Sequence, residues 1–491
     1  MVHFINWLSD VVWNQIFISS FLVIGLFYTI ITKCVQVTYL KHMIKLMFTG
    51  NGSKIGVSSF QAISMSLGSR IGTGNVAGVA TAITLGGPGA IFWMWVMSFL
   101  GAATSFVEIT LAQVYKSKIN GEYRGGTPYF IEKGLGLKKV ALCFAVLTIL
   151  ANGFFLMNIQ SNTISASIQQ AFGFSPVIIG ILLVILMGIL AFGGVKRIAK
   201  TAEVLVPLMA IGYLVVCFII LIFNIDAVPG VFSVIISSAF GTESTFGGIV
   251  GSAITWGVQR GLFSNGAGAG SETFEGGAAE VSHPAKQGLV QALSVYIDTW
   301  IICSATAFMI IITGMYNVKS ASVNNVPGLE AGAPNVQMAV DSILVGFGSK
   351  FLAIALFFFC FTTMIAYYYK AETSLSYMIK NRLDKKNLFL LPLRIGILVC
   401  TFLGTIISAS TAWAIGDIGL GSMAYLNLLS ILFLTKIAMK ALKDYKKQIK
   451  NGKDPEFNPL KLGVKNADYW EERLEKEGKT YITSKKVLVK K

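Results

Sequence analysis

The chain has 491 residues, of which 54% are apolar and 13% are charged. A soluble protein of ordinary composition carries roughly 25% charged residues, so the composition excludes a typical soluble enzyme. The net charge of +16 is concentrated in particular connections and in the C-terminal tail, which favours membrane topology over nucleic-acid binding. Six scattered cysteines and three histidines give neither a disulfide framework nor the ligands of a transition metal.

Apolar segments recur along the whole chain up to about residue 435. Because about 20 predominantly apolar residues cross a bilayer, we expect an all-α membrane protein with about 11 transmembrane helices. The predicted spans cover residues 13–33, 58–85, 88–113, 139–160, 176–194, 203–223, 245–265, 289–313, 350–369, 391–410 and 413–435. Residues 1–435 then form one membrane domain, and residues 436–491 form a basic, solvated tail.

Positive charges alternate between the predicted connections. The connections after spans one, three, five, seven and nine hold twenty Lys and Arg, whereas the others hold only Lys319 and Lys350. Cytoplasmic connections carry the excess of Lys and Arg in multi-spanning proteins. We therefore expect the N-terminus outside the cytoplasm, the C-terminus inside it, and a lipid bilayer around the domain.

Two predicted spans are interrupted by glycine. They read SLGSRIGTGNVAGVA (66–80) and ITWGVQRGLFSNGAGAG (254–270), and they lie five spans apart. The odd separation makes them cross in opposite directions, which indicates two inverted five-helix repeats at 58–223 and 245–435, with 13–33 as one extra N-terminal helix. Paired, glycine-interrupted segments of this kind indicate the binding site of a transporter.

A broken membrane helix exposes backbone groups that need partners, because lipid offers none. The N–H groups freed at a half-helix N-terminus favour an anion, and the freed carbonyls favour a cation. The two breaks therefore suit a zwitterion such as an amino acid. Close packing of Gly74 and Gly78 on another helix is the alternative interpretation for a single such segment.

Four ionisable residues lie inside predicted spans. Arg70 and Arg260 each precede an Asn by five residues, and each is followed 38 residues later by a carboxylate, at Glu108 and Asp298. Charges at this depth must be paired or face water. The pattern leaves two interpretations open, namely gates or relays of transport, or structural ion pairs between the repeats.

Several motifs together resemble the alanine or glycine:cation symporter family. They are GTGNVAGVATAITLGGPGAIFWMW (72–95), YRGGTPYFIEKGLG (123–136), QSNTI (160–164), GVKRIAKTAEVLVPLMA (194–210), WGVQRGLFSN followed by AGAGS (256–271), HPAKQG (283–288) and DTWIICSAT (298–306). The resemblance covers about residues 25–434. It implies a leucine-transporter-type fold and symport of alanine, glycine or glutamine, driven by Na⁺ or H⁺, in the cytoplasmic membrane of a prokaryote.

The resemblance also implies a binding site, residue by residue. The expected substrate-binding residues are Thr73, Gly74, Asn75, Gln160, Ile254, Gly257 and Tyr367, with Ile254 one turn before the second break and Gly257 at it. A Na⁺ site is expected between the carbonyls of Gly68 and Ile71 and the hydroxyls of Thr362 and Thr363.

Two departures from the family pattern concern the substrate and the coupling. Gly266 stands where the family usually has Glu, with Glu272 and Glu275 a little later. Tyr367 replaces a Trp, and Lys370-Ala371-Glu372 replaces Tyr-Gly-Glu. A smaller, hydroxyl-bearing residue at 367 suits a larger or more polar substrate, so glutamine stays an alternative to alanine or glycine.

The sequence thus predicts a cation-coupled symporter of a small neutral amino acid, with Na⁺ preferred over H⁺ as the coupling ion and no other cofactor. An ion channel would need a pore loop or a ring of like residues, which the sequence does not offer. An enzyme would need a nucleophile with a base, or metal ligands, and His3, His42 and His283 lie outside the apolar centres.

Overall fold

The computed structural model describes residues 2–49, 55–119, 121–190, 194–241, 247–329, 331–382 and 386–478. In this part of the chain, eight helices are long and apolar enough to cross a membrane. They are His3–Ile31, Gly89–Val114, Lys138–Phe172, Ile198–Phe223, Pro284–Thr313, Gly348–Met378, Asn387–Ile406 and Ala409–Lys450. The expectation of an all-α membrane protein is confirmed.

The elements up to residue 223 are mainly helices, with one short hairpin between α7 and α8. They are α1 (Val2–Val12), α2 (Gln15–Ile31), α3 (Val35–Thr38), α4 (Leu40–Met47), α5 (Ser59–Arg70), η1 (Gly74–Gly78), α6 (Val79–Gly86), α7 (Gly89–Val114), β1 (Ser117–Ile119), β2 (Glu122–Arg124), α8 (Thr127–Leu135), α9 (Lys138–Thr148), η2 (Ile149–Phe155), α10 (Leu156–Phe172), α11 (Pro176–Leu190) and α12 (Gly194–Phe223). Strands β1 and β2 form an antiparallel hairpin with Lys118 opposite Tyr123.

The second half repeats this order of a broken helix followed by long helices. Its elements are η3 (Ile225–Ala227), α13 (Val228–Ala239), η4 (Gly247–Ile249), α14 (Val250–Asn265), α15 (Thr273–Ala278), α16 (Pro284–Tyr296), η5 (Ile297–Cys303), α17 (Ser304–Thr313), β3 (Asn317–Val318), η6 (Lys319–Ala321), β4 (Val323–Asn324), α18 (Ala333–Asp341), α19 (Gly348–Met378), α20 (Lys386–Ile406), α21 (Ala409–Lys450), α22 (Pro459–Leu462) and α23 (Asp468–Lys476). Strands β3 and β4 pair antiparallel.

Local signals account for where the helices begin. Ser58 and Gln61 form a capping box at the start of α5, which satisfies two N–H groups that the helix leaves free. Asn14 separates α1 from α2 and caps α2 by accepting from the N–H of Phe17. Pro284 opens α16 at a position where its missing N–H costs nothing.

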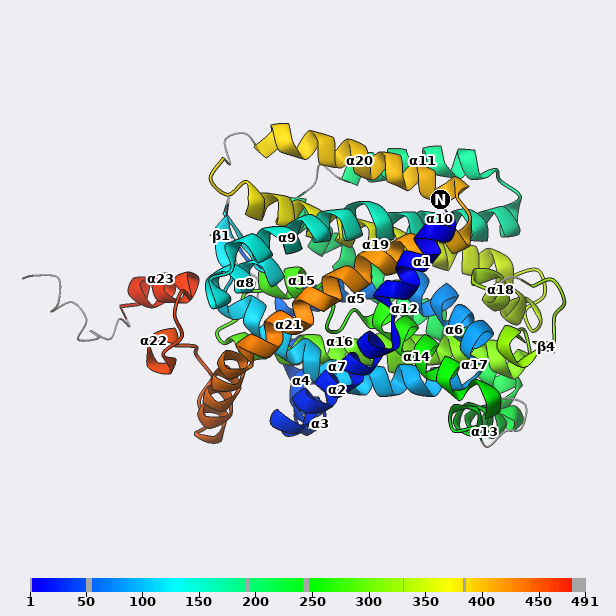
Figure 1. The fold of residues 1–491 in the computed structure, drawn as a ribbon, viewed down its shortest axis with the longest axis horizontal. Helices are drawn as coiled ribbons and strands as arrows, with labels where there is room; N and C mark the ends of the chain where they lie inside the picture. The colour runs from blue at the N-terminus through cyan, green and yellow to red at the C-terminus, as the bar shows by residue number, and fades with distance from the viewer. Residues whose placement is uncertain are drawn as a thin grey trace, which may run out of the picture.

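The long helices run roughly along the long axis of the molecule, as α10, α19 and α20 do in Figure 1, and short elements gather at its two ends. Elements α22, α23 and β1 lie at one end, and α13, α18 and β4 lie at the other. The two broken helices pass through the middle: α14 packs on α7 and on the segment η1–α6, and α5 packs on α12 and α19.

The C-terminal segment after α21 is docked on the end of the molecule that carries β1 and β2 (Figure 1). Trp470 is 1% exposed and donates from its indole nitrogen to the carbonyl of Gln113 at 2.9 Å. Arg473 donates to the carbonyl of Val281, and Phe457 donates from its backbone to Ser282. The predicted solvated tail is therefore packed up to α23, while residues 479–491 lie outside the described residues.

A buried lysine forms the centre of this docking. The ammonium of Lys116 is fully buried, donates to the carbonyl of Ala279 at 2.8 Å, and faces the rings of Tyr123, Tyr469 and Trp470 at 4.5–5.3 Å. Burial lowers the pKa of Lys116 to about 7, whereas the three ring faces favour its charged form. The cage joins the loop before β1 to α23.

We expect Trp470→Ala to release this segment, because the change removes a buried indole worth about 3–5 kcal/mol and its hydrogen bond to Gln113. Limited proteolysis of the purified protein, followed with a C-terminal tag, should then cleave the segment after α21 much faster than in the wild type. The control is Phe433→Ala, an aromatic residue of α21 that is 76% exposed. Equal cleavage rates in both variants would contradict the docking.

Candidate functional site

The first break lies at Ile71 and Gly72, between the end of α5 and the resumption of the helix at Thr73. A side chain at Gly72 would stand 2.6 Å from the Thr363 hydroxyl and 2.9 Å from the Gln160 amide oxygen. Only glycine fits such a close approach. The first break is therefore the point at which α10 and α19 converge on α5.

The N–H groups that this break frees are met by side chains. Gly72 donates from its backbone to the Asn75 side-chain oxygen at 3.0 Å. Thr73 donates from both its backbone and its hydroxyl to the Gln160 side-chain oxygen, at 3.2 and 2.9 Å. Gly74 packs against Ser264 of α14. The structure thus brings together four of the predicted substrate-binding residues in one buried place.

Oxygen atoms converge on the other side of the same break. The Thr363 hydroxyl lies 2.9 Å from the carbonyl oxygen of Gly68 and 3.3 Å from that of Ile71. A small cavity lies beside these atoms, and its lining includes Gly68 and Thr362. The four residues expected to bind a cation are therefore neighbours, and oxygen ligands are those that a hard cation prefers.

The second break follows Asn265 and extends to Glu272. Gly266, Gly268 and Gly270 have φ angles of +63°, +92° and +73°, which glycine adopts without strain. The expectation of a break at Gly257, one turn after Ile254, is wrong, because α14 continues through both residues to Asn265. A side chain at Gly257 would meet the Ala90 carbonyl at 2.5 Å, so this glycine serves helix packing on α7.

The two predicted carboxylates each serve the break of the other half. Glu108, on α7, accepts hydrogen bonds from the N–H groups of Gly268 and Gly270, both at 3.2 Å. Asp298, in η5, accepts one from the Asn75 side chain at 2.6 Å. Both side chains are fully buried. Each half therefore supplies the acceptor that the broken helix of the other half requires.

The equal Arg-to-Asn spacing does not reflect equivalent positions. Arg70 precedes the first break and Asn75 follows it, whereas Arg260 and Asn265 both precede the second break. Arg260 pairs with Asp417 rather than with Glu108 or Asp298, with N–O distances of 2.7 and 3.0 Å.

The two arginines accordingly have separate surroundings. The Arg260 guanidinium also covers the ring of Trp413 at 4.2 Å. Arg70 donates to the Gln291 carbonyl at 3.4 Å and to the Ser294 hydroxyl. Of the two interpretations left open by the sequence, ion pairs among these four residues are therefore not found in the described part of the chain, where Arg260 pairs with Asp417 instead.

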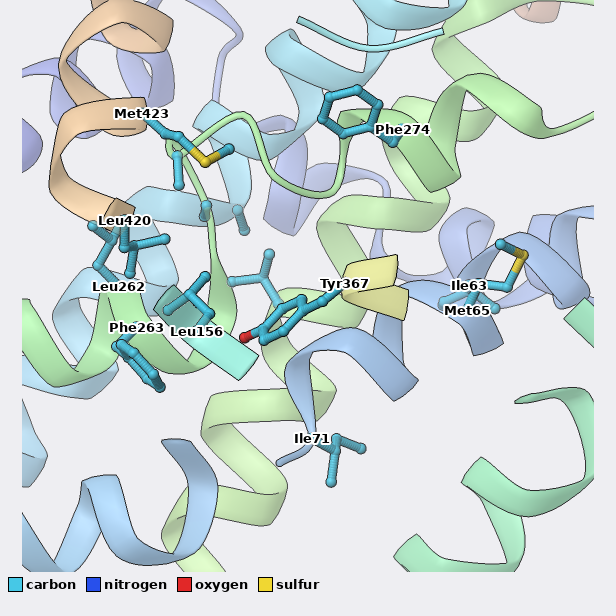
Figure 2. Packing of buried hydrophobic residues seen from close by; sticks show 14 of the residues in the cluster. Ile63, Met65, Ile71, Leu156, Leu262, Phe263, Phe274, Tyr367, Leu420 and Met423 are labelled. Carbon is cyan, nitrogen blue, oxygen red and sulfur yellow. The ribbon is translucent and has the colours of Figure 1, made fainter. Parts of the chain in front are cut away.

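Tyr367 and Lys370 extend from α19 toward the two breaks. In Figure 2 the Tyr367 hydroxyl points toward Leu156 of α10. The Lys370 ammonium is fully buried and donates to Ser69 and Ser271, at 2.5 and 2.6 Å, and to Glu272 at 3.1 Å. Lys370 thus joins the end of α5 to the end of the second break.

The structure also explains why glycine stands at position 266. A side chain there would overlap the carboxylate of Glu272, which folds back against Gly266. The negative charge expected beside the Ser-Asn pair is therefore present, supplied from six residues later in the chain. Gly266 thus leaves the space that the Glu272 carboxylate occupies.

Sequence reasoning missed several residues of this centre. Ser264 donates to Asp298 at 2.7 Å, Cys303 lies 3.4 Å from the Asn75 amide, and Cys360 lies 3.3 Å from the Thr73 hydroxyl. Asp417 was missed although it is a charged residue inside a predicted span, which is the signal that could have identified it.

Two helix ends therefore meet at the centre of the molecule, in contact at Gly74 and Ser264. One end carries the N–H groups of Gly72 and Thr73, which side chains satisfy, and the other is the C-terminal end of α14, where a helix leaves its last carbonyls without intrahelical partners. No cluster of three metal-ligating side chains occurs among the residues that the structure describes.

Comparison with known proteins agrees with this architecture. The sequence model of the Sodium:alanine symporter family matches residues 1–459. The chain is 54% identical to the "Putative sodium/proton-dependent alanine carrier protein YrbD" of Bacillus subtilis (strain 168), over 96% of this chain and 98% of that protein. It is 51% identical to the "Sodium/proton-dependent alanine carrier protein" of Bacillus sp. (strain PS3), over 87% of this chain and 97% of that protein.

A solved structure shares the fold. A mutant manganese transporter of Eremococcus coleocola superposes with a TM-score of 0.51 at 14% sequence identity, covering 90% of this chain and 94% of that one. At this identity the likeness concerns the fold alone.

The Arg260–Asp417 pair allows a test of the packing around the site. Arg260→Met should lower the free energy of unfolding by about 3–5 kcal/mol, because it leaves Asp417 buried without its partner. The double variant Arg260→Met/Asp417→Leu should lose much less. Thermal unfolding in detergent measures both.

The control for this cycle is Lys286→Met, which breaks an ion pair to the exposed Asp454 and should cost less than about 1 kcal/mol. A single Arg260 variant as stable as this control would contradict the assigned pair.

Proposed function

Because the chain belongs to the sodium:alanine symporter family, we propose that it carries alanine together with Na⁺ across the cytoplasmic membrane of a prokaryote. The observation that carries the proposal is the meeting of two opposed helix ends at Thr73 and Ser264, inside a chain whose relatives are named alanine carriers. The names of these relatives favour alanine over glutamine and also include protons.

The carboxylate of the amino acid binds at the first break in this proposal. The N–H groups of Gly72 and Thr73 are held by the side-chain oxygens of Asn75 and Gln160, at 3.0 and 3.2 Å. A substrate carboxylate is a stronger acceptor than a neutral amide oxygen. It therefore takes over these donors, and the Gln160 amide turns to the bound molecule.

The amine of the amino acid binds at the end of α14. The last carbonyls of a helix carry partial negative charge and favour a cation. Ser264 of α14 lies against Gly74, so these carbonyls lie opposite the proposed carboxylate site. Tyr367 bounds the pocket from α19, where its ring limits the length of the substrate side chain.

Na⁺ binds between α5 and α19. Its proposed ligands are the carbonyl oxygens of Gly68 and Ile71 and the hydroxyls of Thr362 and Thr363. The distances of 2.9 and 3.3 Å from the Thr363 hydroxyl to the two carbonyls support this set. Because the ion and the substrate bind on two sides of one break, each stabilises the geometry that the other needs, and the coupling is reciprocal.

Access alternates by rocking of the two halves around this centre. The Arg260–Asp417 pair with Trp413 closes the side at the start of α14, and the Lys370 cluster closes the opposite side. The excess of Lys and Arg in the connections after spans one, three, five, seven and nine supports a cytoplasmic location for the C-terminal tail and an outside location for the N-terminus.

Uptake into proteoliposomes tests the function directly. We expect labelled alanine to accumulate against its gradient when an inward Na⁺ gradient is applied, and not when K⁺ replaces Na⁺. Glycine, serine and glutamine measured in parallel establish the selectivity. An ion channel would show current without accumulation, and an enzyme would return altered substrate in mass analysis. Either result would contradict the proposal.

Thr363→Ala tests the proposed Na⁺ site. Loss of one ligand should raise the half-saturating Na⁺ concentration roughly tenfold, which corresponds to about 1.4 kcal/mol, with unchanged expression. The control is Thr401→Ala, a fully buried threonine whose hydroxyl bonds to the Ile397 carbonyl within its own helix. If both variants kept the wild-type Na⁺ dependence, the ligand set would be wrong.

Gln160→Ala tests the proposed substrate site. It removes the side chain that meets the Thr73 N–H and hydroxyl, so the KM for alanine should rise roughly tenfold while the Na⁺ dependence stays intact. Gln337→Ala, which removes another buried amide bonded to backbone carbonyls of Ser167 and Ser349, serves as control. A KM equal to that of the control would contradict a role in binding.

A further inference from the structure

Three buried ionisable side chains meet on the side of the two breaks that faces the docked C-terminal segment, which we call the tail side. The Lys370 ammonium is 3.1 Å from Glu272 and 3.5 Å from Glu275. The exposed fractions of the three side chains are 0%, 4% and 0%. Two carboxylates and one ammonium leave one negative charge in excess at this place, where water does not reach.

The wider surroundings add one buried cation, Arg70, but they also add two carboxylates, Glu108 and Asp298. Glu275 and Glu108 interact electrostatically with Arg70 and Glu272, and Asp298 interacts with Arg70. The buried ionisable groups around the cluster are Arg70 on α5, Glu108 on α7, Glu272 before α15, Glu275 on α15, Asp298 in η5 and Lys370 on α19. Two further buried cations face α15 and have acidic partners of their own: Arg124 of β2 pairs with Glu122 and Glu372, and Lys116, which donates to the Ala279 carbonyl, interacts with Glu280. Four carboxylates therefore face two cations, and even a Na⁺ ion at the proposed site leaves one carboxylate uncompensated.

Hydrogen bonds identify which carboxylate is left over. Glu108 accepts from two N–H groups and an amide, Asp298 accepts from three side chains, and Glu272 accepts from Lys370. Within the described part of the chain, neither oxygen of Glu275 accepts a hydrogen bond from another residue, and the Lys370 ammonium 3.5 Å away is already bonded to Glu272. An ionised carboxylate buried without donors is very costly, and such a group takes up a proton instead.

We propose that Glu272, Glu275 and Lys370 form a proton-binding site, with the proton on Glu275, which is filled while the tail side is closed and empties when that side opens. No bond other than the O–H bond of Glu275 forms or breaks, and the proton exchanges with water on the tail side. The direction of opening rests on the alternating access of the proposed function.

The position of the site links its proton to the conformation. A β-bridge of Val57 with Ala279 ties the start of α5 to the end of α15, so these two half-helices form one unit. Lys370 connects that unit to α19 through Ser69 and Ser271. When the unit separates from α19, water reaches Glu275 and stabilises its ionised form. By linkage, protons on this side then favour the closed state.

Infrared spectroscopy of the purified full-length protein tests the proton itself. The wild type at neutral pH should show the carbonyl band of a protonated carboxylic acid that Glu275→Gln loses. Glu132→Gln is the control, because that carboxylate is paired with Lys380 away from the cluster, and it should keep the band. The proposal is overturned if Glu275→Gln keeps the band as well.

Melting temperatures separate a protonated Glu275 from an ionised one. Glu275→Gln replaces a neutral acid by a neutral amide, so it should leave the melting temperature of the wild type within about 2 °C. Glu272→Gln should lower it by more than about 5 °C, because it removes the ionised partner of buried Lys370. The reverse order of the two variants would overturn the assignment.

Hydrogen exchange measures the link to opening. At low pH the amides of α15 should exchange at the same rate in the wild type and in Glu275→Gln. Above the pH at which Glu275 loses its proton, the ratio of the wild-type rate to the variant rate should rise by up to tenfold for each pH unit. Comparing both proteins at the same pH removes the intrinsic pH dependence of exchange. A ratio that does not change with pH would overturn the proposal.

These measurements need no transport, so the two proposals can fail separately. Na⁺-driven alanine uptake with an unchanged infrared band in Glu275→Gln would leave the function standing and reject the proton site. A lost band without any Na⁺-driven uptake would do the reverse.

Discussion

The fold depends on satisfying backbone groups where two helices stop in the middle of a membrane. Lipid offers no partner to either break, so the freed N–H groups and carbonyls depend on the protein or on what enters its centre. Glu108 meets the N–H groups of the second break, and Gln160 meets that of Thr73 at the first. These hydrogen bonds to the two breaks thus hold the surrounding helices in place.

This requirement also makes the centre sensitive to a ligand. Partners such as the Gln160 amide and the Thr363 hydroxyl are neutral, and they hold their backbone groups by single hydrogen bonds. A carboxylate or a cation offers a stronger interaction at the same positions. The charged partners are kept for contacts between the halves, where Asp298 holds Asn75 and Glu108 holds Gly268. Strong contacts therefore keep the halves together, and weaker ones yield to the cargo.

Much of this could be predicted from the sequence, and the limits have physical causes. Hydropathy predicts the spans because lipid imposes length and composition, and glycine beside polar residues predicts the breaks. Periodicity cannot tell which of several glycines leaves the helix: Gly257 stays helical and packs on Ala90, whereas Gly266 adopts a positive φ and ends the helix. Equal spacing of Arg and Asn in the two segments likewise does not show at which residue each segment leaves its helix. The partner of Arg260 lies 157 residues away in the chain, and only the packing of α14 on α21 reveals it.

The difference at position 266 shows how a local departure from a family pattern can preserve its electrostatics. Gly266 leaves room that the Glu272 carboxylate occupies, so the negative charge stays beside the break while its point of attachment moves along the chain. From that new position the carboxylate reaches Lys370 on α19, a residue that also departs from the pattern. A buried lysine needs an ionised partner, and a carboxylate attached at 272 supplies one at 3.1 Å. Gly266, Glu272 and Lys370 are therefore linked by direct contacts, and the same ammonium lies 3.5 Å from a second carboxylate, Glu275.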